Sequence, residues 1–285
     1  MNNNTLKLFV GLLCVLMSIG CTANNSKQVV EKTILKGRDL LLVDQIVNEN
    51  IDLTKCLDFK LIESGKKVAV VHSNVVFVNC MFKDFICYRL VDDVTYTVVF
   101  KGRLKFINCV FNGTFDVSSA VVEDEFSVQK SVFAAPFNMN FLWVKGREVS
   151  LSEAVFNQPF SGSNAVIDNH LNCFKSTFKE HVYFQNSHIK GNANFSGAEL
   201  MAYSAFDHTH FGMGATFNKA LFHEKVNFNY AHFIGLSSFD DAQFKEQLSI
   251  KHTHFIGRCS FKNFNYTNIT NQETANFLSG EFPKN

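Results

Sequence analysis

Large apolar residues recur along residues 178–266 at steps that alternate between six and five positions. They are Phe178, Phe184, Ile189, Phe195, Leu200, Phe206, Phe211, Phe217, Phe222, Phe228, Phe233, Phe239, Phe244, Ile250, Phe255, Phe261 and Tyr266. The pattern therefore repeats at every second centre and superimposes again at every fourth. A continuous helix has a period near 3.6 and a continuous strand a period of 2, so neither fits. We predict very short strand-like segments joined by corners, each presenting one large side chain inward.

The residue two positions before each of these centres is small in most cases. These residues are Ser176, Val182, Ser187, Ala193, Ala198, Ser204, Thr209, Ala215, Ala220, Val226, Ala231, Ser237, Ala242, Leu248, Thr253 and Cys259. In an extended segment, positions i−2 and i lie on the same face. A small residue beside a large one fills a narrow coil, and such a coil must stack on neighbours to bury its apolar face.

The segments Ala193–Phe195, Ala215–Phe217 and Ala242–Phe244 carry this pattern and resemble the pentapeptide-repeat family in its Phe-centred variant. The resemblance implies an all-β fold, a right-handed quadrilateral β-helix with one five-residue segment per side. The usual coil has four fives, whereas this chain alternates fives and sixes, so alternate sides carry one extra residue. A Phe-rich β-sandwich is the alternative.

The step of one full coil can be traced back from Tyr266 to Phe82. The column is Phe244, Phe222, Leu200, Phe178, Phe156, Phe133, Phe111 and Phe82. The step between Phe133 and Phe156 is one residue longer than the others, and the step between Phe82 and Phe111 is longer still, which predicts a loop insertion near Val91–Tyr96. We predict a β-helix over 68–267, about nine coils of about 22 residues, between an N-terminal cap at 34–67 and a C-terminal cap or tail at 268–285, since terminal coils need caps. The predicted core includes Phe178, Phe195, Phe217, Phe222, Phe239 and Phe244.

Residues 1–20 read as a secretory signal, with Lys7 before an apolar run from Leu8 to Ile19. The apolar run is too short to span a bilayer. The ending Ile19-Gly20-Cys21 resembles a bacterial lipoprotein cleavage box, which implies that Cys21 carries lipid and that residues 21–33 are a tether. The alternative is an ordinary secreted protein. The expected location is the cell envelope, at the outer membrane or a periplasm-facing membrane.

Charge and composition restrict the class of partner. Removing residues 1–20 takes Lys7 from the 27 basic residues and no acid from the 26 acidic ones, so the mature chain is balanced at 26 of each. A balanced charge argues against a phosphate-binding surface. It also argues against an acidic mimic of nucleic acid, and we expect no nucleic-acid partner. The expected partner is a protein or an envelope polymer.

The cysteines give little sign of chemistry. Besides Cys14 and Cys21, the chain has Cys56, Cys80, Cys87, Cys109, Cys173 and Cys259, with no Cys-x-x-Cys pair. Cys80 and Cys109 occupy the small i−2 position, so most of these thiols are expected to pack in the core as small apolar groups. A bridge between Cys80 and Cys109 in stacked coils is the alternative in an oxidising compartment.

Six of the ten histidines are predicted to lie on one side of the coil. His188, His210, His232 and His254 recur at intervals of one coil, at the outward position before a centre, and His208 and His252 lie two positions earlier in the same segments. Stacked imidazoles can share a divalent metal, because neutral His is a common ligand. The simpler interpretation is a repeat duplicated with its exposed His, and no neighbouring carboxylate is placed to orient a ring. We expect no other cofactor.

Nothing in the sequence indicates catalysis. Ser/His/Asp and Cys/His constellations and Gly-rich phosphate loops are absent, and Glu123-Asp124-Glu125 reads as a solvated corner. We therefore predict a non-catalytic cell-envelope scaffold that presents flat faces to a protein or polymer. A metal-binding envelope protein that uses the histidines is the second hypothesis.

Overall fold

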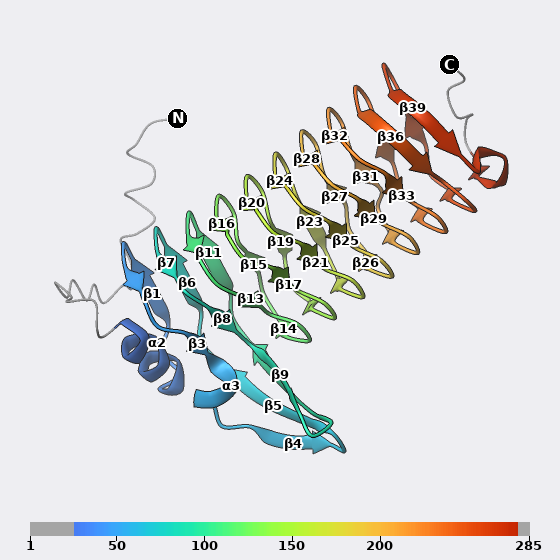
Figure 1. The fold of residues 1–285 in the computed structure, drawn as a ribbon. Helices are drawn as coiled ribbons and strands as arrows, with labels where there is room; N and C mark the ends of the chain where they lie inside the picture. Colours follow the sequence, from blue (N-terminus) through green and yellow to red (C-terminus); the bar gives the residue numbers. More distant parts are fainter. Residues whose placement is uncertain (1–25, 279–285) are drawn as a thin grey trace.

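The described part of the chain is a four-sided β-solenoid. The structure, a computed structural model, describes residues 26–278, and its regular elements are almost all short β-strands. Figure 1 shows the coils stacked along one axis from the N-terminal to the C-terminal end. Within these residues all strand pairings are parallel except β4–β5 and β9–β10. The prediction of a stacked β-helix is confirmed, and the sandwich alternative is wrong.

We number the four sides in the order in which one coil visits them. Side 1 contains β1 (Leu40–Val43), β6 (Val75–Val78), β11 (Leu104–Ile107), β15 (Phe126–Ser127), β19 (Glu148–Ser150), β23 (His170–Asn172), β27 (Ala193–Asn194), β31 (Ala215–Thr216), β35 (Ser237–Ser238) and β38 (Cys259–Ser260). Side 2 contains β2 (Ile46–Val47), β7 (Met81–Phe82), β12 (Val110–Phe111), β16 (Val132–Phe133), β20 (Val155–Phe156), β24 (Thr177–Phe178), β28 (Glu199–Leu200) and β32 (Leu221–Phe222).

Sides 2 and 3 merge at the C-terminal end. Side 3 contains β3 (Ile51–Asp52), β8 (Phe85–Ile86), β13 (Phe115–Asp116), β17 (Phe137–Asn138), β21 (Phe160–Ser161), β25 (Val182–Tyr183), β29 (Ser204–Ala205) and β33 (Val226–Asn227). The longer strands β36 (Gln243–Ser249) and β39 (Asn265–Thr270) run along both sides. Side 4 contains β5 (Lys66–Val71), β10 (Val94–Phe100), β14 (Val121–Val122), β18 (Trp143–Val144), β22 (Val166–Ile167), β26 (His188–Ile189), β30 (His210–Phe211), β34 (His232–Phe233), β37 (His254–Phe255) and β40 (Asn276–Phe277), with β4 (Lys60–Glu63) and β9 (Tyr88–Val91) at its N-terminal end.

A left-handed residue marks every second corner, and it lies within the five-residue steps of the core pattern, not within the six-residue steps. From Asn108 onward a residue with positive φ recurs at every half coil, with one step longer by a single position. These residues are Asn108, Ser119, Lys130, Phe141, Glu153, Asn164, Lys175, Asn186, Gly197, His208, Lys219, Tyr230, Asp241, His252 and Asn263. They lie in tight turns such as the one closed by the hydrogen bond from Ala120 N to Val117 O, 3.2 Å. A positive φ is what the third residue of a type II turn needs. The left-handed residue therefore makes a tight turn inside each five-residue step, and the six-residue steps span the alternate corners.

The interior is a set of aromatic columns. The predicted column from Tyr266 to Phe82 is the observed register of side 2, including the lengthened step between Phe133 and Phe156. Consecutive rings in it lie nearly parallel; the Phe133 and Phe156 centroids are 5.1 Å apart, with an interplanar angle of 6°. Rings of neighbouring columns meet edge to face, an arrangement that the aromatic quadrupole favours. The predicted core residues Phe178, Phe195, Phe217, Phe222, Phe239 and Phe244 are all buried.

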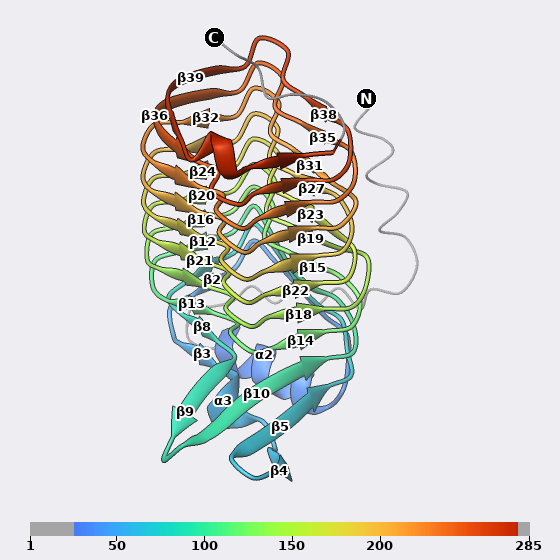
Figure 2. The ribbon, with the colours of Figure 1, turned by 90° about the vertical axis from the view of Figure 1, so that its right-hand side faces the viewer.

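The solenoid has about eight regular turns of about 22 residues, and two longer turns precede them. The first longer turn runs from Leu40 to its partner Val75, and the second runs from Val75 to Leu104. We expected about nine coils beginning at residue 68. The additional length is a projection made by β4, β5, β9 and β10, which Figure 2 shows at the lower end of the rod. The loop insertion expected near Val91–Tyr96 is the β9–β10 hairpin.

The ends of the rod differ from the expected boundaries. Residues 26–35, which we placed mostly in a tether, form helix α2 (Ser26–Leu35), and it buries Val30 and Ile34 against the first coil. The residues expected to cap the rod at 34–67 include β1, the short helix α3 (Leu53–Cys56) and the start of β5, and β1 already pairs with β6. Helix α2 was not expected from the sequence, because most of its residues are polar and only one face of it is apolar.

At the other end, the strands continue beyond the expected boundary at 267. The 3₁₀ helix η1 (Gln272–Thr274) leads into β40, whose pairing with β37 extends side 4 to Phe277. The expected signal peptide, Cys21 and the last residues of the tail lie outside the described residues. Within residues 26–278 no helix combines the length and the apolar character needed to cross a membrane.

Candidate interaction face

The structure brings four histidines into one column on side 4. His188, His210, His232 and His254 each begin a two-residue strand and are paired with one another across β26, β30, β34 and β37. The ring centroids of successive histidines are 4.5, 4.4 and 4.9 Å apart. The interplanar angle grows from 11° at the first pair to 48° and 66° at the next two. We call these four side chains the imidazole column.

The strand alternation explains why the column faces solvent. Each histidine precedes a buried residue, namely Ile189, Phe211, Phe233 and Phe255. Because successive side chains in a strand point to opposite faces, burying the second residue directs the histidine outward. His188 is exposed, and the other three are half-buried by their neighbours. The sequence spacing therefore places the column, whereas the ring angles come only from the structure.

A second column runs beside the first. His208, Tyr230 and His252 occupy left-handed corner positions two residues before the imidazole column. The rings of His208 and Tyr230 are 4.8 Å apart at 2°, and those of Tyr230 and His252 are 5.1 Å apart at 42°. Six of the ten histidines thus lie on side 4 or at its edge. We call the two columns together the imidazole face.

The stacking shifts the acid–base behaviour of the two central rings. Partial burial lowers the pKa of His210, and the neighbouring His232, His188 and His208 lower it further. Burial also lowers the pKa of His232, with added repulsion from His254 and His208. Burial and a like charge both disfavour an imidazolium. The centre of the column is therefore neutral at pH 7, and it becomes cationic only in more acidic solution.

This shift predicts that acid destabilises the protein. The unfolded chain takes up protons as the pH falls below the ordinary histidine value of about 6.5, before folded His210 and His232 do. Stability that is complete above that value is lost as the pH falls through the lowered pKa values of the two folded histidines. We expect the Tm to fall between about pH 7.5 and pH 5.5, and to fall less in a His210→Gln/His232→Gln variant. Calorimetry across this range checks the result, and equal falls in both proteins would contradict it.

Among the residues that the structure describes, no group of side chains on this face is arranged to hold a metal ion. Within residues 26–278, no group of three or more His, Cys, Asp or Glu side chains is placed to hold a metal ion. The first pair of rings in the column is nearly parallel, and the next two pairs are tilted, so the column is packed ring against ring. The rings form a stack, and metal binding by these histidines stays a prediction.

The N-terminal half of side 4 carries a different surface. The outward residue there is apolar, as in Val121, Trp143 and Val166. The Trp143 indole N–H donates to Asp168 at 3.0 Å, and the ammonium of Lys145 lies 4.4 Å from the indole centroid. The Lys190 ammonium is 2.6 Å from Asp168, which helps to lower the pKa of that carboxyl group against the opposing effect of its burial.

The acidic triplet Glu123-Asp124-Glu125 is paired with cations from neighbouring coils. Glu123 lies 2.7 Å from Lys101 and 3.6 Å from Lys145. Asp124 lies 3.2 Å from Arg103 and 3.3 Å from Arg147, and Glu125 lies 2.7 Å from Lys105. We expected a solvated corner and missed this network. The cations lie about one coil before and after the acids in the sequence, and this spacing could have predicted the network.

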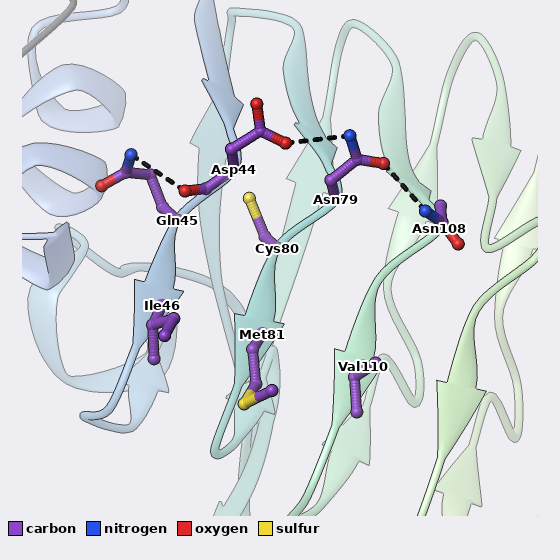
Figure 3. A pocket seen from close by; sticks show the side chains of 8 residues that line it. All are labelled: Asp44, Gln45, Ile46, Asn79, Cys80, Met81, Asn108 and Val110. Atoms are coloured by element: carbon purple, nitrogen blue, oxygen red, sulfur yellow. Dashed lines mark hydrogen bonds between the residues drawn. The ribbon is translucent and has the colours of Figure 1, made fainter.

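A hollow of about 370 Å³ opens between sides 1 and 2 at the first three coils. Its lining residues are Asp44, Gln45, Ile46, Asn79, Cys80, Met81, Asn108 and Val110. Figure 3 shows Asp44, Asn79 and Asn108 in a row along one edge, joined by hydrogen bonds of 2.9 Å from Asn79 to Asp44 and from Asn108 to Asn79. These three residues have positive φ, and their amide and carboxylate groups tie the corners of successive coils together.

The cysteines of the described residues are all free thiols. Cys80, Cys87, Cys109 and Cys173 are buried, and Cys56 and Cys259 are half-buried. Cys80 and Cys109 are neighbours, because the residues that follow them, Met81 and Val110, are paired across the coils. The Cys80 thiol donates to the carbonyls of Leu42 and Val78, and the Cys109 thiol donates to that of Ile107. The interaction between the two thiols lowers the pKa of Cys80 and raises that of Cys109. The pair is adjacent but not bridged.

The comparison with protein families gives one match, and it lies in the regular coils. Residues 206–254 and 217–264 match the family described as Pentapeptide repeats (9 copies). The searches of curated proteins and of solved structures found no match. The matched segment contains every member of the imidazole face except His188, and it shares its Phe-rich core with the coils before it. Residues 206–264 therefore match the pentapeptide-repeat family, and the described coils before them continue the same Phe-rich β-solenoid.

Proposed function

We propose that this protein is a non-catalytic scaffold of the cell envelope, anchored by lipid at Cys21, whose flat sides bind a protein or an envelope polymer. The observation that carries the proposal is the unbroken register of side 4. From β14 to β40 each outward side chain lies directly over the next, so the side presents straight rows rather than a cleft. Rows at one strand spacing, about 4.8 Å, suit an extended partner that makes the same contact in several coils.

The rigidity of the rod supports the same proposal. The core is filled by aromatic rings in contact from Phe77 to Phe277, partly stacked and partly edge to face, and the first corners are tied by hydrogen bonds between coils. A surface that is already ordered loses little conformational entropy when it binds, so more of the contact energy appears as affinity. Proteins built from stacked repeats commonly use an extended surface in this way.

Cys21→Ser tests the lipid anchor. We expect the unaltered protein to incorporate labelled palmitate and to partition into the detergent phase, and the variant to do neither. A Cys56→Ser variant is the matched control, because Cys56 lies inside the fold and should leave partitioning unchanged. Partition of the Cys21→Ser protein into detergent to the same extent would contradict the anchor.

Site-specific cross-linking in intact cells tests the use of side 4. A photoreactive residue at position 232 projects from the imidazole face, and one at position 194 projects from side 1. We expect adducts of defined size from position 232 that are absent from position 194. Equal labelling at the two positions would show that side 4 has no special role.

A further inference from the structure

We propose that the imidazole face binds a linear polyanion, a polymer carrying phosphate groups, when the surroundings become mildly acidic. The proposal rests on the proposed scaffold function and deepens it by naming the chemistry of the partner. The net charge of the whole chain is +1 with neutral histidines. This net charge describes the whole chain and does not reveal that six histidines lie together on side 4 and at its edge.

The groups that face the column show how one-sided this surface is. Its outward positions from coil to coil are His188, His210, His232 and His254, and the column ends on uncharged Val166 and Asn276. Beside it run His208, Tyr230 and His252 on one flank and Lys190, Gly212, Ile234 and Ile256 on the other.

The charged groups at the borders of the face add little acid to it. The cations there are Lys190, Lys251 and Arg258, and the acids are Asp168, which is paired with Lys190 at 2.6 Å, Asp207 and Glu273. Asp207 is half-buried and accepts a hydrogen bond from Asn227 at 3.2 Å. Burial raises the pKa of Asp207, so its carboxylate is weakened as a counter-charge in acid. Protonation of the histidines therefore adds up to six positive charges to a face whose nearby acids are Glu273, Asp207, which lies beside His208, and Asp168, which is already paired with Lys190.

The spacing of the rings makes an external anion the natural partner. Successive imidazoles are 4.4–4.9 Å apart, so each added proton is repelled by a neighbour at close range. Two charges this close interact strongly even near a protein surface. An anion that lies along the column removes this repulsion, and by linkage the polyanion promotes protonation as protonation promotes binding.

The length of the column favours a polymer over a single anion. The four rings extend over four coils, whereas one phosphate reaches only the two nearest rings. A chain of phosphates can contact all four rings and the parallel row of His208 and His252. Binding of this kind releases counterions and therefore weakens as salt is added.

The test is calorimetric titration of the full chain with sodium polyphosphate, whose backbone phosphates stay ionised throughout, at about pH 7.5 and about pH 5.5. We expect binding at least about tenfold tighter in acid, with a heat that falls as salt is added. A His210→Gln/His232→Gln variant should lose most of that gain. The matched control, His72→Gln/His181→Gln, removes two exposed histidines that lie off the face and should keep it.

The outcomes separate this proposal from the scaffold proposal. Equal affinity at the two pH values, or an equal loss in the control variant, would overturn the histidine face as the site. Binding in acid to vesicles of phosphatidylglycerol but not to polyphosphate would overturn the polymer as its occupant. The melting temperature at about pH 5.5 gives a second readout, because polyphosphate should raise it in the unaltered protein and not in the His210→Gln/His232→Gln variant. None of these results depends on Cys21 or on the cross-linking experiment.

Discussion

Phe217→Ala lowers the free energy of unfolding by about 3–5 kcal/mol, the cost of emptying a fully enclosed aromatic site. The Phe217 side chain has no exposed surface. Its ring lies 5.0 Å from that of Phe195 and 5.1 Å from that of Phe239, nearly parallel to both. It also meets Phe206 and Phe228 edge to face. The substitution therefore interrupts two directions of packing, along the column and across the coil.

Denaturant unfolding of the variant measures this cost, with Phe141→Ala as the matched control. Phe141 is a corner residue whose side chain is 60% exposed, so the same change there should alter stability by no more than about 0.5 kcal/mol. An unchanged midpoint for Phe217→Ala would show that the ring does not support the fold. A repeat protein can lose cooperativity when one coil is weakened, so the slope of the transition should be compared as well.

Gly214→Ala has an effect of similar size for a different reason. Gly214 has φ of +102°, a conformation that residues with a Cβ rarely adopt, and a Cβ there would overlap the carbonyl oxygen of Leu236 in the next coil. The carbonyl of Gly214 also accepts the hydrogen bond from Ala193 N, 3.1 Å, so the backbone cannot move without loosening side 1. We expect a loss of about 3–5 kcal/mol, in the range of severe single substitutions.

Gly37→Ala separates the cost of backbone strain from the cost of the steric overlap between coils. Gly37 also has positive φ, +63°, but a Cβ there would meet no atom within 4 Å. It should therefore cost only the backbone strain, about 1 kcal/mol. If thermal unfolding shows the same loss in both variants, then the close approach of the coils at Gly214 is not a constraint on the fold.

The regular coils could be predicted from the sequence because one residue decides each side. Alternating steps of five and six place Phe178 to Phe255 inward, and the structure pairs them at the expected register of one coil. The first coil could not be predicted, because the strands of the projection lengthen it and remove the period. In the second coil the sequence placed Phe82 and the insertion near Val91–Tyr96. Helix α2 was missed for a related reason: only Val30 and Ile34 mark its apolar face, and two residues four apart do not make a period.

The position of the imidazole face could be predicted from the sequence, but the arrangement of its rings could not. The spacing of His188, His210, His232 and His254 required a column on one side, yet it could not indicate whether the rings share a metal or stack. Side-chain rotation decides that question, and sequence spacing does not contain it. The pairing of Asp124 with Arg103 and Arg147 differs from this case, because the cations lie about one coil before and after the acid and their spacing could have indicated it.

The left-handed corner that returns at every half coil sets the unit in which this rod can change length. Removing or inserting one whole coil returns every later strand to the same side, so the outer rows continue unbroken. Inserting or removing half a coil would keep large apolar residues in the core, but it would move residues from side 4 to side 2. The imidazole column would then lie on the opposite side of the rod. Gain or loss of whole coils is thus the only change in length that keeps each row of outward side chains on its own side.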